Sequence, residues 1–191
     1  MTVHASRAAW CVALIVLLCA LVFFNMPASS TREAAETPAD PLAEFASDAP
    51  SGHEVGEQLP DFTLTTVGGK DFTLSAHRGG VTIINLWATW CTPCVNELPH
   101  FDKLQRTYPE DVTVLAIHSD LITDDVAEYL AGYDYAITFA IDEGGEIIKS
   151  VGGSTMLPQT MVLDQYGVVT YNKVGSVTYE ALGALLQEAL H

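Results

Sequence analysis

The sequence predicts an α/β domain with a central mixed sheet flanked by helices, and three observations indicate it. Short apolar runs rich in β-branched residues, typical of buried strands, alternate with segments whose apolar residues follow helical spacing. Strand–helix–strand succession implies crossover connections and therefore a parallel central portion. The last two runs are joined by a short turn at Tyr166 and Gly167, which predicts an antiparallel pair at the end of the sheet.

The elements follow in order from these patterns. Alternating residues on both sides of Gly68-Gly69 predict a β-hairpin ahead of the sheet. Leu98, Phe101 and Leu104 recur at helical spacing and predict a helix, and Thr123 can cap another. The predicted strands cover residues 81–87, 112–117, 137–141, 160–163 and 168–174, and the predicted helices cover residues 94–108, 123–132, 146–151 and 178–190.

The N-terminal part of the chain differs from the predicted domain. Residues 8–24 carry no charged or strongly polar side chain, and Arg7 precedes them. As a helix this segment would be about 26 Å long, which favours a single transmembrane anchor with the rest of the chain exported. The small residues at 28–30 leave a cleaved signal peptide open. We expect an anchor at residues 1–26, an acidic Pro/Ala-rich linker at 27–58, and a domain at 59–191.

The overall charge restricts the possible partners. The 191 residues include 24 Asp and Glu but only 8 Lys and Arg, so the formal net charge is −16. Such a surface repels phosphate backbones, and we expect no nucleic-acid partner.

The pair Cys91 and Cys94 is the strongest chemical signal in the sequence. It comes directly after a predicted buried strand and begins a predicted helix, and Pro93 suits an early helical position. Two cysteines three residues apart on a first helical turn are within disulfide reach. The helix N-terminus favours a thiolate at Cys91 and lowers the pKa of such a thiol from about 8.5 toward about 7. Cys94, one turn further in, should be more buried and act as the resolving thiol.

Two other interpretations of the pair are less favourable. A zinc site needs further ligands, but the other cysteines, Cys11 and Cys19, lie in the apolar segment, and no histidine pair has ligand spacing. A purely structural disulfide closing so small a loop would remove little entropy from the unfolded chain. We therefore expect redox chemistry, with no metal and no cofactor, because the cysteine pair is itself the redox group.

The segment from Asn85 to Cys94 resembles the active-site segment of thioredoxin-fold proteins. More narrowly, it resembles the TlpA/ResA branch of exported, often membrane-anchored thiol–disulfide oxidoreductases. The likeness extends over residues 56–191 and includes the initial hairpin. It implies that Cys91 attacks and Cys94 resolves, and that Pro158 is a cis proline facing them. Ordinary thioredoxin has a buried aspartate where this chain has Asn85, so the resemblance shifts the carboxylate role to Glu97.

The resemblance also implies a substrate-binding surface around the cysteines. The residues expected to contact an extended substrate are Trp90, Thr92, Pro93, Met156 and Leu157. For Glu97, partial burial should raise its pKa and let it exchange protons with the resolving thiol, whereas the alternative is a solvated helix glutamate. Trp87 is expected in the core and His118 in a loop.

The predicted function is an exported thiol–disulfide oxidoreductase that reduces protein disulfides in the cell envelope, for example in cytochrome c maturation. Its expected partners are protein thiols and disulfides and a transmembrane electron donor. Its expected place is the outer face of a bacterial cytoplasmic membrane, or the soluble periplasm after cleavage. Two alternatives stay open: a disulfide oxidant or isomerase, and a non-enzymatic copper chaperone that binds Cu(I) through the two thiolates.

Overall fold

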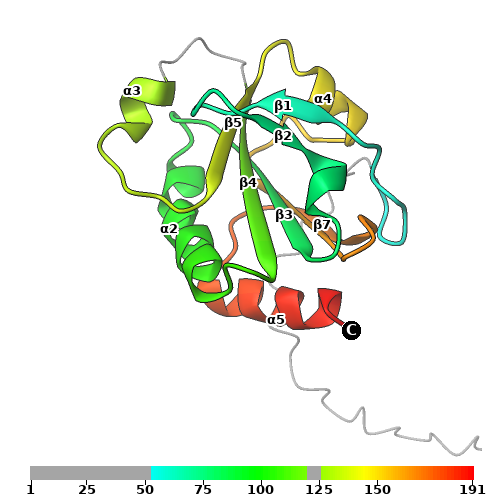
Figure 1. Cartoon of the computed structure of the whole chain (residues 1–191). Coiled ribbons are helices and arrows are strands. Elements are labelled where there is room, and N and C mark those ends of the chain that lie inside the picture. Colours follow the sequence, from blue (N-terminus) through cyan, green and yellow to red (C-terminus); the bar gives the residue numbers. More distant parts are fainter. Residues whose placement is uncertain (1–52, 120–125) are drawn as a thin grey trace, which may run out of the picture. The chain divides into compact units, whose positions relative to one another are not determined.

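A five-stranded mixed sheet is the centre of the computed structural model, which describes residues 53–119 and 126–191 (Figure 1). The strand order is β5-β4-β3-β6-β7. β3 pairs in parallel with β4, and β4 with β5, whereas β6 runs antiparallel to both β3 and β7. The predicted parallel centre and antiparallel end are therefore confirmed. The strands are β3 (Val81–Trp87), β4 (Val112–Ser119), β5 (Thr138–Asp142), β6 (Gln159–Leu163) and β7 (Val169–Val174).

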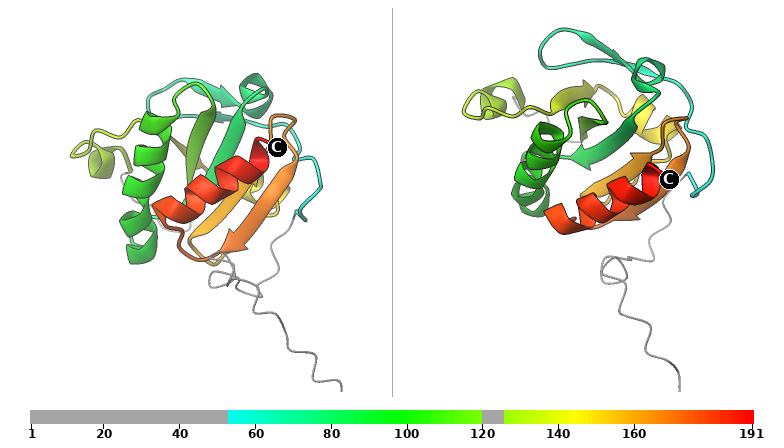
Figure 2. Two further views of the ribbon diagram at one scale, coloured as in Figure 1. Left: turned by 90° about the horizontal axis from the view of Figure 1, so that it is seen from below. Right: turned by 60° about the horizontal axis from the view of Figure 1, so that its bottom comes forward.

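Each face of the sheet has its own apolar core. The helices α2 (Thr92–Thr107) and α5 (Tyr179–Ala189) lie together on one face (Figure 2). Their apolar stripes pack on alternate residues of β3 such as Ile83 and Trp87. The opposite face is covered by residues of the hairpin, of a short 3-10 helix and of α4. These elements are β1 (Thr63–Thr65), β2 (Asp71–Thr73), the 3-10 helix η2 (Leu74–His77) and α4 (Glu146–Ser150).

Both outer strands of the sheet are paired with chain that precedes β3. Beside β5, Thr66 forms a bridge with Ala140, and the N–H of Val67 donates to the carbonyl of Phe139 at 2.8 Å. Beside β7, the N–H of Gly56 donates to the carbonyl of Val169 at 2.8 Å. The residues from 53 to 58, which the sequence places in the linker, therefore contact the domain.

Several differences from the expected elements have local causes. The 3-10 helix η2 was not predicted, because four residues are too few to show helical periodicity. The helix α3 spans Val126–Leu130, and its expected cap at Thr123 lies outside the described residues. The expected anchor at residues 1–26 also lies outside them. Within the described part of the chain, no helix is long and apolar enough to cross a membrane.

Candidate active site

The sulfur atoms of Cys91 and Cys94 are joined in a disulfide at the start of α2. The strand β3 delivers the chain to this point, and a turn closes when the N–H of Cys91 donates to the carbonyl of Ala88 at 3.1 Å. The Cα atoms of the two cysteines are 5.3 Å apart, as adjacent positions on a first helical turn require. The predicted strand–turn–helix setting of the pair is thus present.

Cys91 is the N-cap residue of α2. Its Sγ accepts a hydrogen bond from the backbone N–H of Cys94 at 3.3 Å. A thiolate at this position is stabilised by that N–H and by the positive end of the helix dipole. Cys91 is 5% exposed and Cys94 is fully buried, so Cys91 is the more accessible sulfur, as expected for an attacking thiol.

The residues expected to bind substrate occupy two segments. Trp90 is 48% exposed and Met156 is 50% exposed, and the turn residues Thr92 and Pro93 are also exposed. Such exposed apolar side chains beside a reactive sulfur suit contact with a polypeptide.

The second of these segments ends in the expected proline. The Leu157–Pro158 peptide bond is cis, and the carbonyl of Pro158 accepts from the N–H of Gly175 at 2.8 Å. Leu157 packs against the same core cluster that contains both cysteines. Leu157 and the cysteines therefore share one core cluster, although more than sixty positions separate them in the sequence.

Glu97 lies one turn beyond Cys94, on the inner side of α2, and is only 2% exposed. Its Oε1 accepts from Nδ2 of Asn85 at 2.7 Å, and its Oε2 accepts from the N–H of Val177 at 2.9 Å. Burial raises the pKa of Glu97 to about 7, although both hydrogen bonds oppose the shift by favouring the ionised form. A carboxyl group with this pKa can accept and return a proton near neutral pH.

A hollow of about 360 Å³ runs beside this carboxyl group. It lies between the first turns of α2 and the segment that leads into α5. The residues that line it are Thr92, Pro93, Asn96, Glu97, His100, Ser176, Val177 and Thr178. Glu97 is therefore buried by packing but adjoins an opening next to the cysteine turn.

His118 corrects an expectation, because it is not a loop residue. It lies in β4, beside Trp87 of β3 in the parallel register, and is almost fully buried. Its ring meets the Trp87 ring edge-on, with centroids 5.3 Å apart. Nε2 accepts from the N–H of Thr89 at 3.4 Å, so His118 supports the turn that carries Cys91. Trp87 is a core residue, as predicted.

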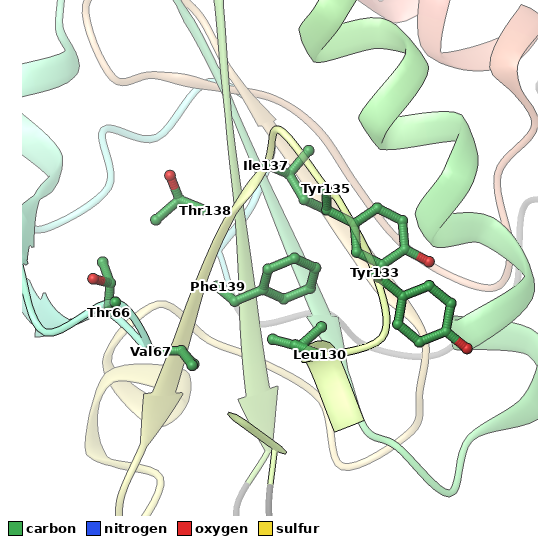
Figure 3. A pocket seen from close by; sticks show the side chains of 9 residues that line it. Thr66, Val67, Leu130, Tyr133, Tyr135, Ile137, Thr138 and Phe139 are labelled. Carbon is green, nitrogen blue, oxygen red and sulfur yellow. The ribbon is translucent and has the colours of Figure 1, made fainter. Parts of the chain in front are cut away.

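A second hollow, of about 310 Å³, lies between the hairpin loop and β5 (Figure 3). Leu130, Tyr135 and Phe139 gather on one side of β5, and Thr66 and Thr138 lie on the other. None of the residues predicted for the site lines it. Among residues 53–119 and 126–191 there is also no group of three metal-ligating side chains close enough to hold a metal ion.

Sequence reasoning missed two partners of Glu97. Asn85 was noted as a departure from thioredoxin, but not as a hydrogen-bond donor to the glutamate. An amide within the apolar run of β3 was the available signal, because such a group needs a buried partner. The N–H of Val177 left no signal in the sequence, since it is a backbone group eighty positions away.

Two features together define the class of protein to which this chain belongs: the cysteine pair at the end of β3, and the mixed sheet flanked by helices. The chain is a thiol–disulfide oxidoreductase with a thioredoxin-like fold. More particularly, the chain belongs to the Redoxin family, whose model matches residues 54–185.

Individual relatives agree with this family. The thiol-disulfide oxidoreductase ResA of Bacillus thuringiensis subsp. konkukian is 36% identical over 117 residues, which are 61% of this chain and 67% of that protein. The thioredoxin-like protein YneN of Bacillus subtilis is 33% identical over 121 residues, 62% of this chain and 70% of YneN.

Solved structures show the same similarity in three dimensions. A thiol:disulfide interchange protein of the thioredoxin family from Chlorobium tepidum TLS matches with a TM-score of 0.64 and 26% identity, over 76% of this chain and all of that one. The pneumococcal exposed lipoprotein thioredoxin Etrx1 of Streptococcus pneumoniae matches with a TM-score of 0.62 and 26% identity, over 68% of this chain and 99% of that one.

Proposed function

We propose that this protein is an exported, membrane-anchored reductant of protein disulfides in the bacterial envelope. The observation that carries the proposal is the position of Cys91, whose sulfur caps α2 and accepts the N–H of Cys94. That position stabilises a thiolate at the more exposed of the two sulfurs, while the fully buried Cys94 is protected from outside partners. Apocytochrome c thiols, which must be reduced before haem attachment, are one substrate that we propose for such a reductant.

The proposed reaction moves two electrons from the dithiol to the substrate. The Cys91 thiolate attacks one sulfur of the substrate disulfide, that bond breaks, and the other substrate sulfur leaves as a thiolate that takes up a proton. Cys94 then loses its proton and attacks Cys91 in the mixed disulfide. The second substrate sulfur leaves, and the Cys91–Cys94 disulfide remains. A transmembrane electron donor would return the pair to the dithiol.

Within this reaction we assign to Glu97 the role of accepting the proton of the Cys94 thiol. The carboxyl group lies three residues beyond Cys94 on the inner side of α2, and burial raises its pKa to about 7. Its ionised form can therefore take the thiol proton as Cys94 attacks, and its protonated form can return it when the reaction runs backwards. Trp90, Thr92, Pro93, Met156 and Leu157 would hold the substrate, with Pro158 exposing the Leu157 backbone for strand-like pairing.

Export and anchoring are supported by the N-terminal sequence. The apolar residues 8–24 follow Arg7, which suits an N-terminus in the cytoplasm and a domain on the outer face of the membrane. One of the structural relatives carries the description of an exposed lipoprotein. Residues 27–52 would then hold the domain away from the bilayer.

Trapping the mixed disulfide tests the proposal. In a Cys94→Ser variant the second attack cannot occur, so Cys91 should remain covalently joined to its substrate in membranes of the source bacterium. We expect non-reducing gels and mass spectrometry to show envelope proteins, c-type apocytochromes among them, linked to Cys91. A Cys91→Ser variant is the matched control and should capture nothing.

The reduction potential of the Cys91–Cys94 pair decides whether the protein reduces or oxidises its substrates. A value near about −270 mV is expected for a reductant, whereas a value near about −120 mV would assign the protein to the oxidants. Capture of cytosolic proteins alone would contradict the envelope location.

A further inference from the structure

The side chain of Asn85 on β3 contacts the Glu97 carboxyl group, and Thr160 is the cross-strand partner of Asn85 on β6. We propose that Asn85, supported by Thr160, is the positioning residue that holds this carboxyl group both with and without its proton. The inference depends on the proton-transfer role proposed above for Glu97, and it assigns that role a partner.

Asn85 is placed for this task by the alternation of β3. Its neighbours on the same face, Ile83 and Trp87, belong to the core cluster beneath α2. Asn85 is fully buried, and Nδ2 is 2.7 Å from Oε1 of Glu97. Burying an amide in an apolar cluster is unfavourable unless it is hydrogen-bonded, so this short bond is the interaction that makes the position tolerable.

The ionised carboxylate fits its surroundings. An ionised carboxylate only accepts hydrogen bonds, and each of its oxygens here faces a donor, namely Nδ2 of Asn85 and the N–H of Val177. These donors come from β3 and from the segment before α5, while Glu97 itself is on α2. The carboxylate is therefore fixed by three elements at once.

The protonated carboxyl group needs a different partner. It carries an O–H that must donate, and a backbone N–H such as that of Val177 cannot accept. The Asn85 amide can accept, because a half-turn of the amide brings Oδ1 to the place of Nδ2. Within the described residues Oδ1 has no hydrogen-bond partner, so rotating the amide group breaks no hydrogen bond of that oxygen. One side chain can thus serve both protonation states.

Thr160 is the cross-strand neighbour of Asn85, and we assign its hydroxyl group to the amide. It is the direct partner of Asn85 in the antiparallel β3–β6 register, so the two side chains share a face of the sheet. Its hydroxyl group is buried, and among the described residues it has no hydrogen-bond partner. A hydroxyl group both donates and accepts, so it can give its proton to Oδ1 or, after the turn, accept from Nδ2.

Other titratable groups face Glu97 and must be controlled. Cys91 and Cys94 lie on the same helix, His100 lines the same hollow, and Tyr171 approaches from β7. Burial raises the pKa of Tyr171, and the charge of Glu97 adds to this shift. Titrating the oxidised protein removes the thiols, and His100→Asn removes the imidazole from the hollow.

The test measures the protonation of Glu97 directly, by the infrared band of its protonated carboxyl group as a function of pH. Loss of the band in Glu97→Gln assigns it. In Asn85→Leu, which keeps the branched shape but removes the amide, the ionised form loses its donor, so we expect the midpoint to rise by about one pH unit or more. Thr160→Val should move the midpoint when Asn85 is present. It should not move the midpoint when combined with Asn85→Leu, because Thr160 acts through Asn85.

An unchanged Glu97 midpoint in folded Asn85→Leu overturns the inference. Should that variant fail to fold, Asn85→Asp keeps both size and polarity. Two carboxyl groups would then share the site, and we expect two titration steps, the upper one above the wild-type midpoint. A single unchanged step would again overturn the inference. Disulfide-exchange rates of Glu97→Gln test the role of Glu97 separately, so the two failures are distinguishable.

Discussion

At the scale of single residues, the buried carboxyl group of Glu97 makes folding depend on pH. Its pKa is about 7 in the folded protein and 4.5 as a free side chain, because burial disfavours the charge. Between these values the folded state binds more protons than the unfolded state. Stability is therefore highest below about pH 4.5 as far as this group is concerned, and it falls as pH rises to about 7.

We predict that Glu97→Gln removes this dependence, because glutamine stays neutral. In wild type the group should cost on the order of 3 kcal/mol of unfolding free energy between pH 4.5 and pH 8. The difference between the two oxidised proteins, measured by chemical denaturation at both pH values, isolates this group. Equal pH dependence in both would contradict the burial argument.

The same variant should slow disulfide exchange about tenfold or more, with the largest effect near neutral pH. Exchange rates that match wild type across pH 5–9 would remove Glu97 from the chemistry.

Some residues of the site could be predicted from neighbouring sequence, and others depend on contacts between distant segments. Cys91, Cys94 and the start of α2 were predictable, because strand, turn and helix signals adjoin within ten positions. The burial of Glu97 was predictable from its place on the inner side of that helix. The burial of His118 was not, since it depends on Trp87 from another strand and on the turn at Thr89. The N–H of Val177 is placed by the β7–α5 connection, which no local pattern encodes.

At the scale of elements, the segment before Pro158 packs closely against Ile148 of α4 and Leu86 of β3 at Gly153. A Cβ atom added there would lie 2.5 Å from Cγ2 of Ile148 and 2.7 Å from Cδ1 of Leu86. It would also lie 2.9 Å from the backbone carbonyl oxygen of Ile148. Real Cβ atoms do not approach so closely, so α4 or the segment itself must shift.

We predict that Gly153→Ala lowers the free energy of unfolding by about 1–3 kcal/mol and slows reduction of protein substrates. The matched control is Gly183→Ala in α5, where an added Cβ meets nothing within 4 Å. That substitution should stabilise the protein by about 0.5–1 kcal/mol, because alanine favours a helix. Thermal unfolding of both variants checks the contrast, and equal effects would contradict it.

The elements themselves were largely predictable, and their limits less so. The five strands and the helices α2, α4 and α5 follow from periodicity, because apolar alternation determines which face is buried. The pairing of residues 53–58 with β7 did not follow, since those residues are mostly polar and show no apolar alternation. Backbone hydrogen bonds to Val169 attach them, together with side-chain bonds of His53 and Gln58 to backbone carbonyls, and none of these partners is signalled by a local pattern.

At the scale of the whole molecule, the formal net charge of −16 influences which substrates arrive fastest. A field of this sign attracts cationic polypeptides and repels anionic ones, and salt screens both effects. Charge steering changes the rate of encounter only. Salt does not screen the apolar contacts around Cys91, so substrate binding at that surface should not share this salt dependence.

We predict that reduction of a cationic disulfide peptide slows about threefold or more between 0.05 and 0.5 M salt. Reduction of an anionic peptide of equal length should become faster, and a neutral peptide serves as the control. Stopped-flow measurement of tryptophan fluorescence, to which Trp87 and Trp90 beside the cysteine pair contribute, can follow each reaction. Identical salt dependence for the three peptides would contradict steering by charge.

The pairing of both outer strands with the chain ahead of β3 has a consequence for solubility. An unpaired strand edge is a template for another copy of the chain, and proteins that expose long edges aggregate. Here one N-terminal stretch protects both edges, through Gly56 beside β7 and Val67 beside β5. Shortening the chain to begin at Val81 would leave the cysteine pair and its helix intact in sequence, but it would expose two templates at once.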